Sequence, residues 1–177
     1  MKRLIIAIFL GATALTAPVA SSSAQDFNPF EIGGALGAAI PVGDFGDEAD
    51  VGYNATFILG YKPAFSPLGF RFDAAYNEMG DEVFTDESFQ IPSFTGNLVF
   101  EMPTAGFRPY LIGGAGLYRV GTSISGIEAE NKFGFNAGAG ISMPLSGFKV
   151  FVEARYNHVS FDAGNVTFVP ITFGAIF

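Results

Sequence analysis

The last twelve residues of the chain, Val166–Phe177, restrict its possible folds more than any other segment. Apolar side chains recur there at every second position, and side chains two apart share one face of a strand. The residues on this face are Val169, Ile171, Phe173, Ala175 and Phe177. An apolar strand with free edges tends to aggregate in water. We therefore expect lipid to cover this face and another strand to pair with each edge.

Residues 1–24 have the parts of a secretory signal peptide. Lys2 and Arg3 supply the positive start, an apolar stretch follows, and Ser22–Ala24 place small residues before a predicted cleavage ahead of Gln25. The apolar stretch is shorter than the ~20 residues that a spanning helix needs. No later stretch is long enough either, so a membrane-spanning form of this chain would be a closed barrel.

Eight later segments alternate between apolar residues and polar or small ones, which is typical of strands with one apolar face. Their predicted bounds are 30–42, 52–62, 70–79, 89–102, 107–120, 132–143, 148–159 and 166–177. Pro92 predicts an irregular start or a bulge in the fourth segment, because proline lacks an N–H donor. The facing of the fifth segment is ambiguous, since both of its faces are mostly apolar or glycine.

The connections between these segments alternate in character. Those after the first, third, fifth and seventh segments are acidic or rich in Gly and Ser, and those after the second, fourth and sixth are short and contain proline. This pattern predicts an all-β fold, an eight-stranded antiparallel up-and-down barrel that crosses a membrane, with both termini at the short-turn, periplasmic end. Residues 1–24 would be removed, and residues 25–177 would form a single barrel domain.

Charged residues in the middle of two segments predict which face turns inward. Arg71 and Asp73 share the polar face of the third segment, and Glu153 and Arg155 share that of the seventh. A basic side chain at the middle of the bilayer costs about 2–4 kcal/mol. This face is therefore expected to line the lumen, where the four charges would pair in a salt-bridge network. The alternative is a soluble, lipocalin-like barrel with an apolar interior.

The eight segments and their connections resemble the small OmpA/OmpX-like family of outer-membrane β-barrels. The signal segment, Pro41–Phe45, Arg108–Tyr118 and the terminal Phe177 carry the resemblance. It implies a plugged barrel in the outer membrane of a Gram-negative-type bacterium, surrounded as a monomer by lipid and lipopolysaccharide. It also implies that the outer-membrane assembly machinery recognises the last strand through Phe173 and Phe177.

The residue types present argue against several functions. Seventeen acidic residues against nine basic ones argue against nucleic acid as a partner. A chain with no Cys and one His lacks the usual zinc ligands, and no cofactor fingerprint is present, so no metal or cofactor is expected. The acidic segments Asp44–Asp50 and Asp81–Glu87 leave binding of Ca²⁺ or Mg²⁺ open, but neither has EF-hand spacing.

One pair of residues resembles part of an active site. His158 and Ser160 lie two residues apart, as in the lipid A deacylases of the same barrel size, in which a downstream Glu orients the His. Here no Glu follows Glu153, and Asp162 is the one later carboxylate. We therefore predict a non-enzymatic barrel with a structural or surface-interaction role. A narrow passive pore and a lipid A-modifying enzyme that uses His158 and Ser160 are the alternatives.

Overall fold

The computed structural model of the protein describes residues 28–47, 49–80, 88–122, 129–161 and 164–177. The predicted signal segment, its cleavage site, the acidic segment 81–87 and Asp162 lie outside these ranges. Along the described chain, no helix is long and apolar enough to cross a membrane.

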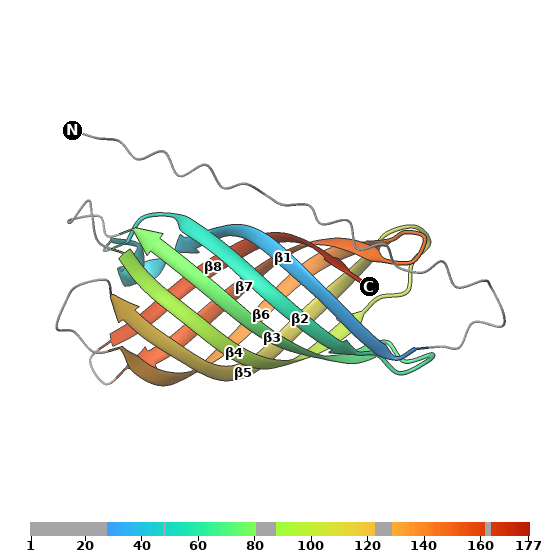
Figure 1. Ribbon diagram of the computed structural model, residues 1–177, viewed down its shortest axis with the longest axis horizontal. Helices are drawn as coiled ribbons and strands as arrows, with labels where there is room; N and C mark the ends of the chain where they lie inside the picture. Colours follow the sequence, from blue (N-terminus) through green and yellow to red (C-terminus); the bar gives the residue numbers. More distant parts are fainter. Residues whose placement is uncertain (1–27, 48, 81–87, 123–128, 162–163) are drawn as a thin grey trace, which may run out of the picture.

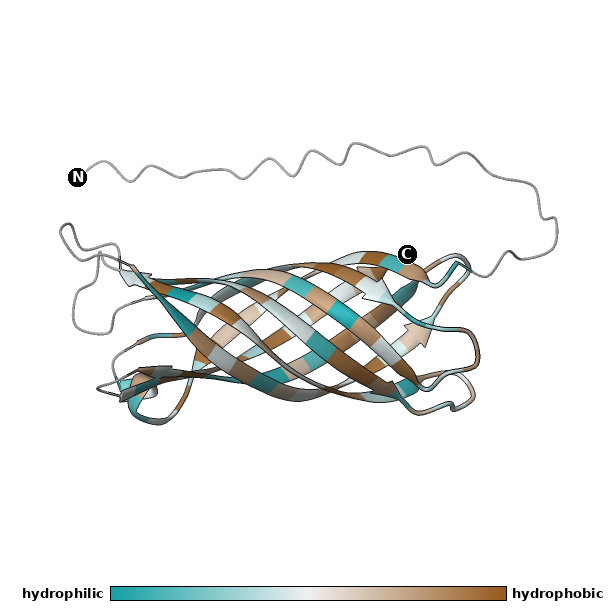
Figure 2. Cartoon of the chain, turned by 90° about the horizontal axis from the view of Figure 1, so that it is seen from below, coloured by the Kyte–Doolittle hydropathy of each residue, from teal (hydrophilic) through white to brown (hydrophobic). Residues whose placement is uncertain are grey.

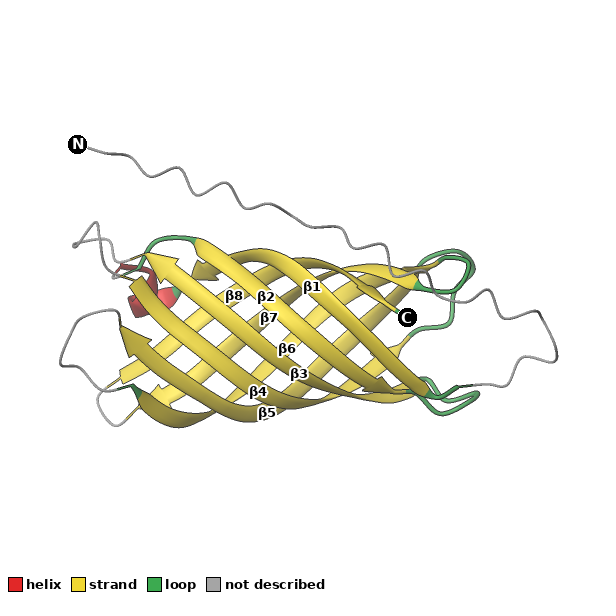
Figure 3. Ribbon diagram, viewed as in Figure 1, coloured by secondary structure: helices red, strands yellow, loops and turns green. Residues whose placement is uncertain are grey.

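Eight strands close into one antiparallel barrel in the order of the sequence (Figure 1). They are β1 (Phe30–Pro41), β2 (Gly52–Tyr61), β3 (Leu68–Gly80), β4 (Ser88–Glu101), β5 (Arg108–Thr122), β6 (Glu130–Pro144), β7 (Lys149–Phe161) and β8 (Gly164–Ile176). A short 3-10 helix, η1 (Gly43–Asp47), lies at the barrel end opposite the short turns (Figure 3). The predicted fold class is confirmed, and the strand ends differ from the prediction by at most two residues.

Strand β8 pairs with β1 and closes the barrel. The amide of Ile32 donates to the carbonyl of Phe177 at 3.1 Å, and the amide of Phe177 donates back at 2.8 Å. Following the paired residues once around the barrel from Glu31 returns to β1 at Pro41, ten residues further along. This stagger tilts the strands against the barrel axis. Closure pairs both edges of the C-terminal strand, which removes its tendency to aggregate.

In every strand except β5, the two faces separate as the alternation predicts, and most of the large apolar side chains lie on the outer wall. Figure 2 shows apolar and polar residues alternating along the strands. Strand β5, whose facing was ambiguous, turns Tyr110, Ile112 and Tyr118 inward and Leu111 and Leu117 outward. Its large inward side chains are aromatic or branched, and its inward Gly114 and Gly116 lie against the backbone of β4.

The bulge predicted at Pro92 is absent from β4. Pro92 pairs with Tyr76 of β3, and the register between β4 and β5 is the same on either side of it. Only the pairing of Ile91 and Pro92 with β5 is interrupted. A proline removes one donor from the ladder, and the strand continues through this position because its other edge remains paired.

The inward side chains form three layers along the barrel axis, and β7 crosses all three: Phe151 first, then the polar positions, then Val159. The apolar layer at the end with the short turns contains Ala35, Ile58, Tyr110, Ile112, Phe151 and Ile176. The apolar layer at the opposite end, which we call the loop end, contains Ala39, Phe45, Ala49, Met79, Ile91, Tyr118, Val159 and Phe168. Most of the buried polar and charged residues lie between them, and Glu101 and Ser142 lie at the end with the short turns.

Candidate functional site

The four predicted lumen charges lie together in the middle layer. Arg71, Asp73, Glu153 and Arg155 are each at most 9% exposed. Arg71 donates to Asp73 at 2.9 Å and, through both terminal nitrogens, to Glu153 at 2.9 Å. Arg155 donates to Asp73 at 2.8 Å and also pairs with Glu153. The result is a closed ring of two cations and two anions, in which every charge has two partners of opposite sign.

Two pairs of strand positions bring this ring together. Residues two apart point to the same side of a strand, so Arg71 and Asp73 both project into the lumen from β3, and Glu153 and Arg155 from β7. In a ring of eight strands β3 and β7 face one another. The Arg71–Glu153 and Arg155–Asp73 pairs therefore span the lumen between opposite walls, 82 residues apart in sequence.

Three neutral residues complete the network, and the sequence did not indicate them. The hydroxyl of Tyr110 donates to Glu153 at 2.9 Å, and the amide of Asn97 donates to Asp73 at 3.2 Å. The guanidinium of Arg71 lies 5.6 Å from the ring centre of Phe151. Tyr110 belongs to the strand of ambiguous facing, so its inward position could not be read from the pattern. The network is expected to be rigid, because its charges are paired and each side chain is held in one rotamer by several contacts.

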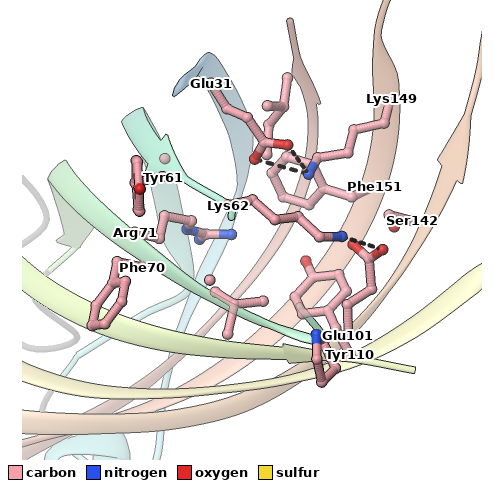
Figure 4. Close-up of a pocket in the computed structure, with 15 residues that line it drawn as sticks. Glu31, Tyr61, Lys62, Phe70, Arg71, Glu101, Tyr110, Ser142, Lys149 and Phe151 are labelled. Atoms are coloured by element: carbon pink, nitrogen blue, oxygen red, sulfur yellow. Dashed lines mark hydrogen bonds and ion pairs between the residues drawn. The ribbon is translucent and has the colours of Figure 1, made fainter. Parts of the chain in front are cut away.

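A second set of charges lies nearer the short turns, around a small cavity. Lys62 pairs with Glu101 at 2.6 Å and Lys149 with Glu31 at 2.8 Å, as Figure 4 shows. Arg108 adds a longer contact of 3.2 Å to Glu101. This cavity has a volume of about 40 Å³, and a second one beside the four-charge ring has about 30 Å³. Volumes of this size have room for a few water molecules each.

The loop end of the lumen is plugged by Phe45 of η1. Its side chain is 4% exposed and meets the ring of Phe89 edge-on, with 5.2 Å between the ring centres. Gly43 has a φ of +65°, a conformation that glycine adopts without strain, and it turns the chain from β1 into η1. The amide of Val42 donates to the carbonyl of Thr167 at 3.0 Å, which fixes this turn to β8.

His158 and Ser160, the pair on which the enzymatic alternative depends, lie near the loop end of β7. The imidazole Nδ1 of His158 is 3.4 Å from the hydroxyl of Thr167, and the ring packs against Phe135 with 4.9 Å between centres. Ser160 is exposed and pairs with Asn165 across the β7–β8 hairpin. Among the residues that the structure describes, no carboxylate is hydrogen bonded to His158, and Asp162 lies outside them. In a catalytic triad, Nδ1 of the histidine would contact a carboxylate. Here Nδ1 of His158 contacts the hydroxyl of Thr167 instead.

Acidic residues form no candidate cation site in the described ranges. No group of three or more His, Asp or Glu side chains there has an arrangement that could hold a metal ion. Asp44 and Asp47 of η1 belong to the described part of the first acidic segment, whereas residues 81–87 of the second do not. Binding of Ca²⁺ or Mg²⁺ by the second segment, which the sequence left open, concerns residues outside the described ranges.

Residues 7–177 match the family model described as an outer membrane protein beta-barrel domain. The chain belongs to this family. Membership of this family places the protein in the outer membrane of a Gram-negative-type bacterium, as the sequence predicted. Comparison with curated proteins finds no match.

Solved structures of other outer-membrane barrels share the fold. The Neisserial surface protein A has a TM-score of 0.70 at 17% identity, covering 84% of this chain and 96% of that one. The N-terminal barrel domain of Pseudomonas aeruginosa OprF has a TM-score of 0.52 at 16% identity, covering 84% and 98%. The outer membrane enzyme PagL has a TM-score of 0.51 at 19% identity, covering 83% and 98%. Because one of these proteins is an enzyme, the fold by itself does not decide whether this barrel is one.

The two predicted assembly residues of this outer-membrane barrel both point outward. Phe173 is 61% exposed and Phe177 is 66% exposed. The ring of Phe177 stacks on Phe148 at the start of β7, with 5.5 Å between the ring centres. Both rings are thus available on the outer wall, and their recognition by an assembly machinery stays a prediction.

Proposed function

We propose that this protein is a non-enzymatic barrel that reinforces the outer membrane and presents acidic loops at the cell surface. The observation that carries the proposal is the filled lumen. Two apolar layers enclose a fully paired ring of charges, and the cavities beside it are of water size. A filled interior of this kind favours a structural role, as a stiff wall that carries loops, over a role in transport.

The composition of the four loop-end connections supports a surface role. Ten Asp and Glu residues occur in these connections, and no Lys or Arg: Asp44, Asp47, Glu48, Asp50, Asp81, Glu82, Asp86, Glu87, Glu128 and Asp162. Such a surface attracts basic partners, or divalent cations that bridge it to lipopolysaccharide phosphates. Lipopolysaccharide held through divalent cations is the partner we propose for the loops.

The test compares cells with and without the gene for sensitivity to detergents and large antibiotics. The loss strain is expected to become more sensitive, and the wild-type gene is expected to restore resistance. A variant with Asp81 and Asp86 changed to Asn and Glu82 and Glu87 changed to Gln should restore it incompletely, and added Mg²⁺ should narrow the difference between the strains. A loss strain with unchanged sensitivity would contradict the reinforcing role.

A passive pore is the first alternative, and conductance separates it from a plugged barrel. Purified protein in planar bilayers is expected to show no stable single-channel steps, because both apolar layers close the lumen. Reproducible steps from the folded protein would instead favour the pore.

A lipid-modifying enzyme is the second alternative. It is favoured by the shared fold with an outer membrane enzyme and by the outward position of His158 and Ser160 on one strand. Ser160→Ala expressed in a strain that lacks the wild-type gene tests it by mass spectrometry of lipid A. The acyl pattern of lipid A is expected to be the same in the loss strain, in the loss strain with the wild-type gene and in the loss strain with the variant gene. A change that requires Ser160 would establish the enzyme.

A further inference from the structure

One basic side chain differs from all the others that the structure describes. Six basic residues in the described ranges form ion pairs with carboxylates: Lys62, Arg71, Arg108, Lys132, Lys149 and Arg155. Arg119 of β5 has no ion pair within these ranges, and it is exposed. It follows the inward Tyr118, so it points away from the lumen. Arg119 is therefore a cation on the outer wall that the described chain leaves unpaired.

The height of Arg119 on the wall places it at the level of the lipid headgroups. It is eleven positions after Arg108, which begins β5 at the short-turn end. At about 3.3 Å per residue and a tilt of about 40°, these positions span roughly 28 Å of the membrane. The apolar band of a transmembrane barrel is about 25 Å tall. With the loop end at the cell surface, Arg119 lies at the outer edge of this band.

The wall around Arg119 offers hydrogen-bond donors and no negative charge. Asn131 of β6 is the residue paired with Arg119, Ser160 lies on the next strand, β7, and both are exposed. No carboxylate occupies an outward position of β5, β6 or β7, which the structure describes in full. The outward carboxylate of Glu78 belongs to β3, two strands from β5, where two tyrosine hydroxyls donate to it. An anion next to Arg119 would thus meet donors on the side of β6 and β7.

Large apolar side chains lie on the same wall, nearer the middle of the membrane. Leu117 precedes Arg119 by two residues on β5, and its paired residue on β6 is Phe133. Leu117 is 59% exposed and Phe133 is 65% exposed. Acyl chains that cover these two side chains would bring the headgroup of the same lipid to Arg119. The wall therefore fits a lipid with an anionic headgroup, and the lipid of the outer leaflet that carries phosphate is lipopolysaccharide.

We propose that Arg119, with Asn131 and Ser160, binds a phosphate of the lipid A part of lipopolysaccharide directly. The planar guanidinium matches a phosphate with two parallel hydrogen bonds, and the amide and the hydroxyl supply further donors. The site rests on the proposed function for its partner, lipopolysaccharide, but the contact is a different one. The acidic connections need a divalent cation to hold a phosphate, whereas Arg119 needs none.

The test uses the folded barrel in detergent with EDTA, which removes the divalent cations that the acidic connections need. Equimolar lipid A and the same lipid A after enzymatic removal of its phosphates are added. Native mass spectrometry is expected to show about twofold to fivefold more adduct with the phosphorylated form, the range for an exposed ion pair. Arg119→Gln should lose this preference. Equal binding of the two forms by the wild type, or a preference that persists in Arg119→Gln, would overturn the proposal.

Two further variants show whether the position and the shape of the cation matter. Arg108→Gln makes the same substitution at the short-turn end, and it should keep the wild-type preference. Arg119→Lys keeps the charge but not the planar fork, so it should retain part of the preference. Heat-modifiable gel mobility shows that each variant is folded, and Lys132→Gln replaces Arg108→Gln if the latter is not. An equal loss in the control would assign the effect to net charge and overturn the site.

Mg²⁺ in place of EDTA separates this site from the proposed function. The acidic connections should then also hold lipid A, in the wild type and in Arg119→Gln alike. Adducts that require Mg²⁺, with no preference in EDTA, would overturn the site at Arg119 and leave the proposed function in place. A loss strain of unchanged sensitivity, with a preference that disappears in Arg119→Gln, would overturn the reinforcing role and support the site.

Discussion

The guanidinium of Arg71 on β3 donates two hydrogen bonds of 2.9 Å to the carboxylate of Glu153 on β7. Both side chains are buried, and the bonds join opposite walls of the barrel. Because the bonds are bidentate and charge-assisted, they hold the two side chains in one geometry and so favour one separation of the two walls.

Glu153→Gln should lower the free energy of unfolding by about 3–5 kcal/mol, because it leaves two buried guanidinium groups with one carboxylate. Urea unfolding in lipid vesicles measures the change. The control is Glu130→Gln, whose pair with Lys132 at 3.0 Å involves a carboxylate that is 60% exposed, and about 1 kcal/mol or less is expected there. Equal losses in the two variants would contradict a stabilising role for the ring.

Gly140→Ala should destabilise the barrel by about 1–3 kcal/mol through overpacking. A Cβ at Gly140 would meet the ring and hydroxyl of Tyr110, and so would displace Tyr110 from Glu153. Gly113→Ala is the matched control, because its Cβ would have ordinary contact only, 3.7 Å from the carbonyl of Asn136. The measurement is the urea midpoint of unfolding of each variant. A larger loss of stability in Gly113→Ala than in Gly140→Ala would show that Tyr110 moves aside without cost.

Phe45→Ala should remove the plug at the loop end at a cost of roughly 3–5 kcal/mol, the usual range for a buried phenylalanine. Phe65→Ala changes an aromatic residue that is fully exposed in a short turn, and a change within about 0.5 kcal/mol is expected. Thermal unfolding of the two variants provides the comparison. No conductance is expected in Phe45→Ala, since the layer near the short turns remains closed.

Phe177→Ala should slow insertion into the outer membrane if the terminal ring is an assembly signal. The same substitution also removes stacking on Phe148, so Phe148→Ala is the control that loses this contact and keeps the terminal residue. Pulse-chase labelling with heat-modifiable mobility follows the folded fraction with time. A delay in Phe177→Ala alone supports recognition, whereas equal delays would assign the effect to packing.

The strands, their faces and the lumen charges could be predicted because alternation in a strand is a local property. Arg71 and Asp73 must share a face, whatever the rest of the chain does. At Pro92 the prediction was an irregular start or a bulge. The interrupted pairing with β5 is such an irregularity, because proline removes one donor, and no bulge forms because the pairing with β3 continues along the other edge.

Residues that act through distant contacts could not be predicted in this way. Tyr110 reaches Glu153 only after closure has placed β5 and β7 around one lumen, and Phe45 becomes a plug only because η1 is tied to β8. Glu78 did carry a signal, as a carboxylate on the apolar face of its strand, but its two tyrosine partners are apparent only when β2 and β3 are paired.

The sequence by itself determined that there would be eight strands and, in all of them except β5, which face is apolar and which is polar or small, because side-chain direction in a strand repeats every two residues. Tertiary structure decided which inner charges meet, how the lumen is filled, and which basic side chain of the described ranges lies unpaired on the outer wall. Those outcomes depend on closure and on the ten-residue stagger around the barrel, which are set by all eight strands together.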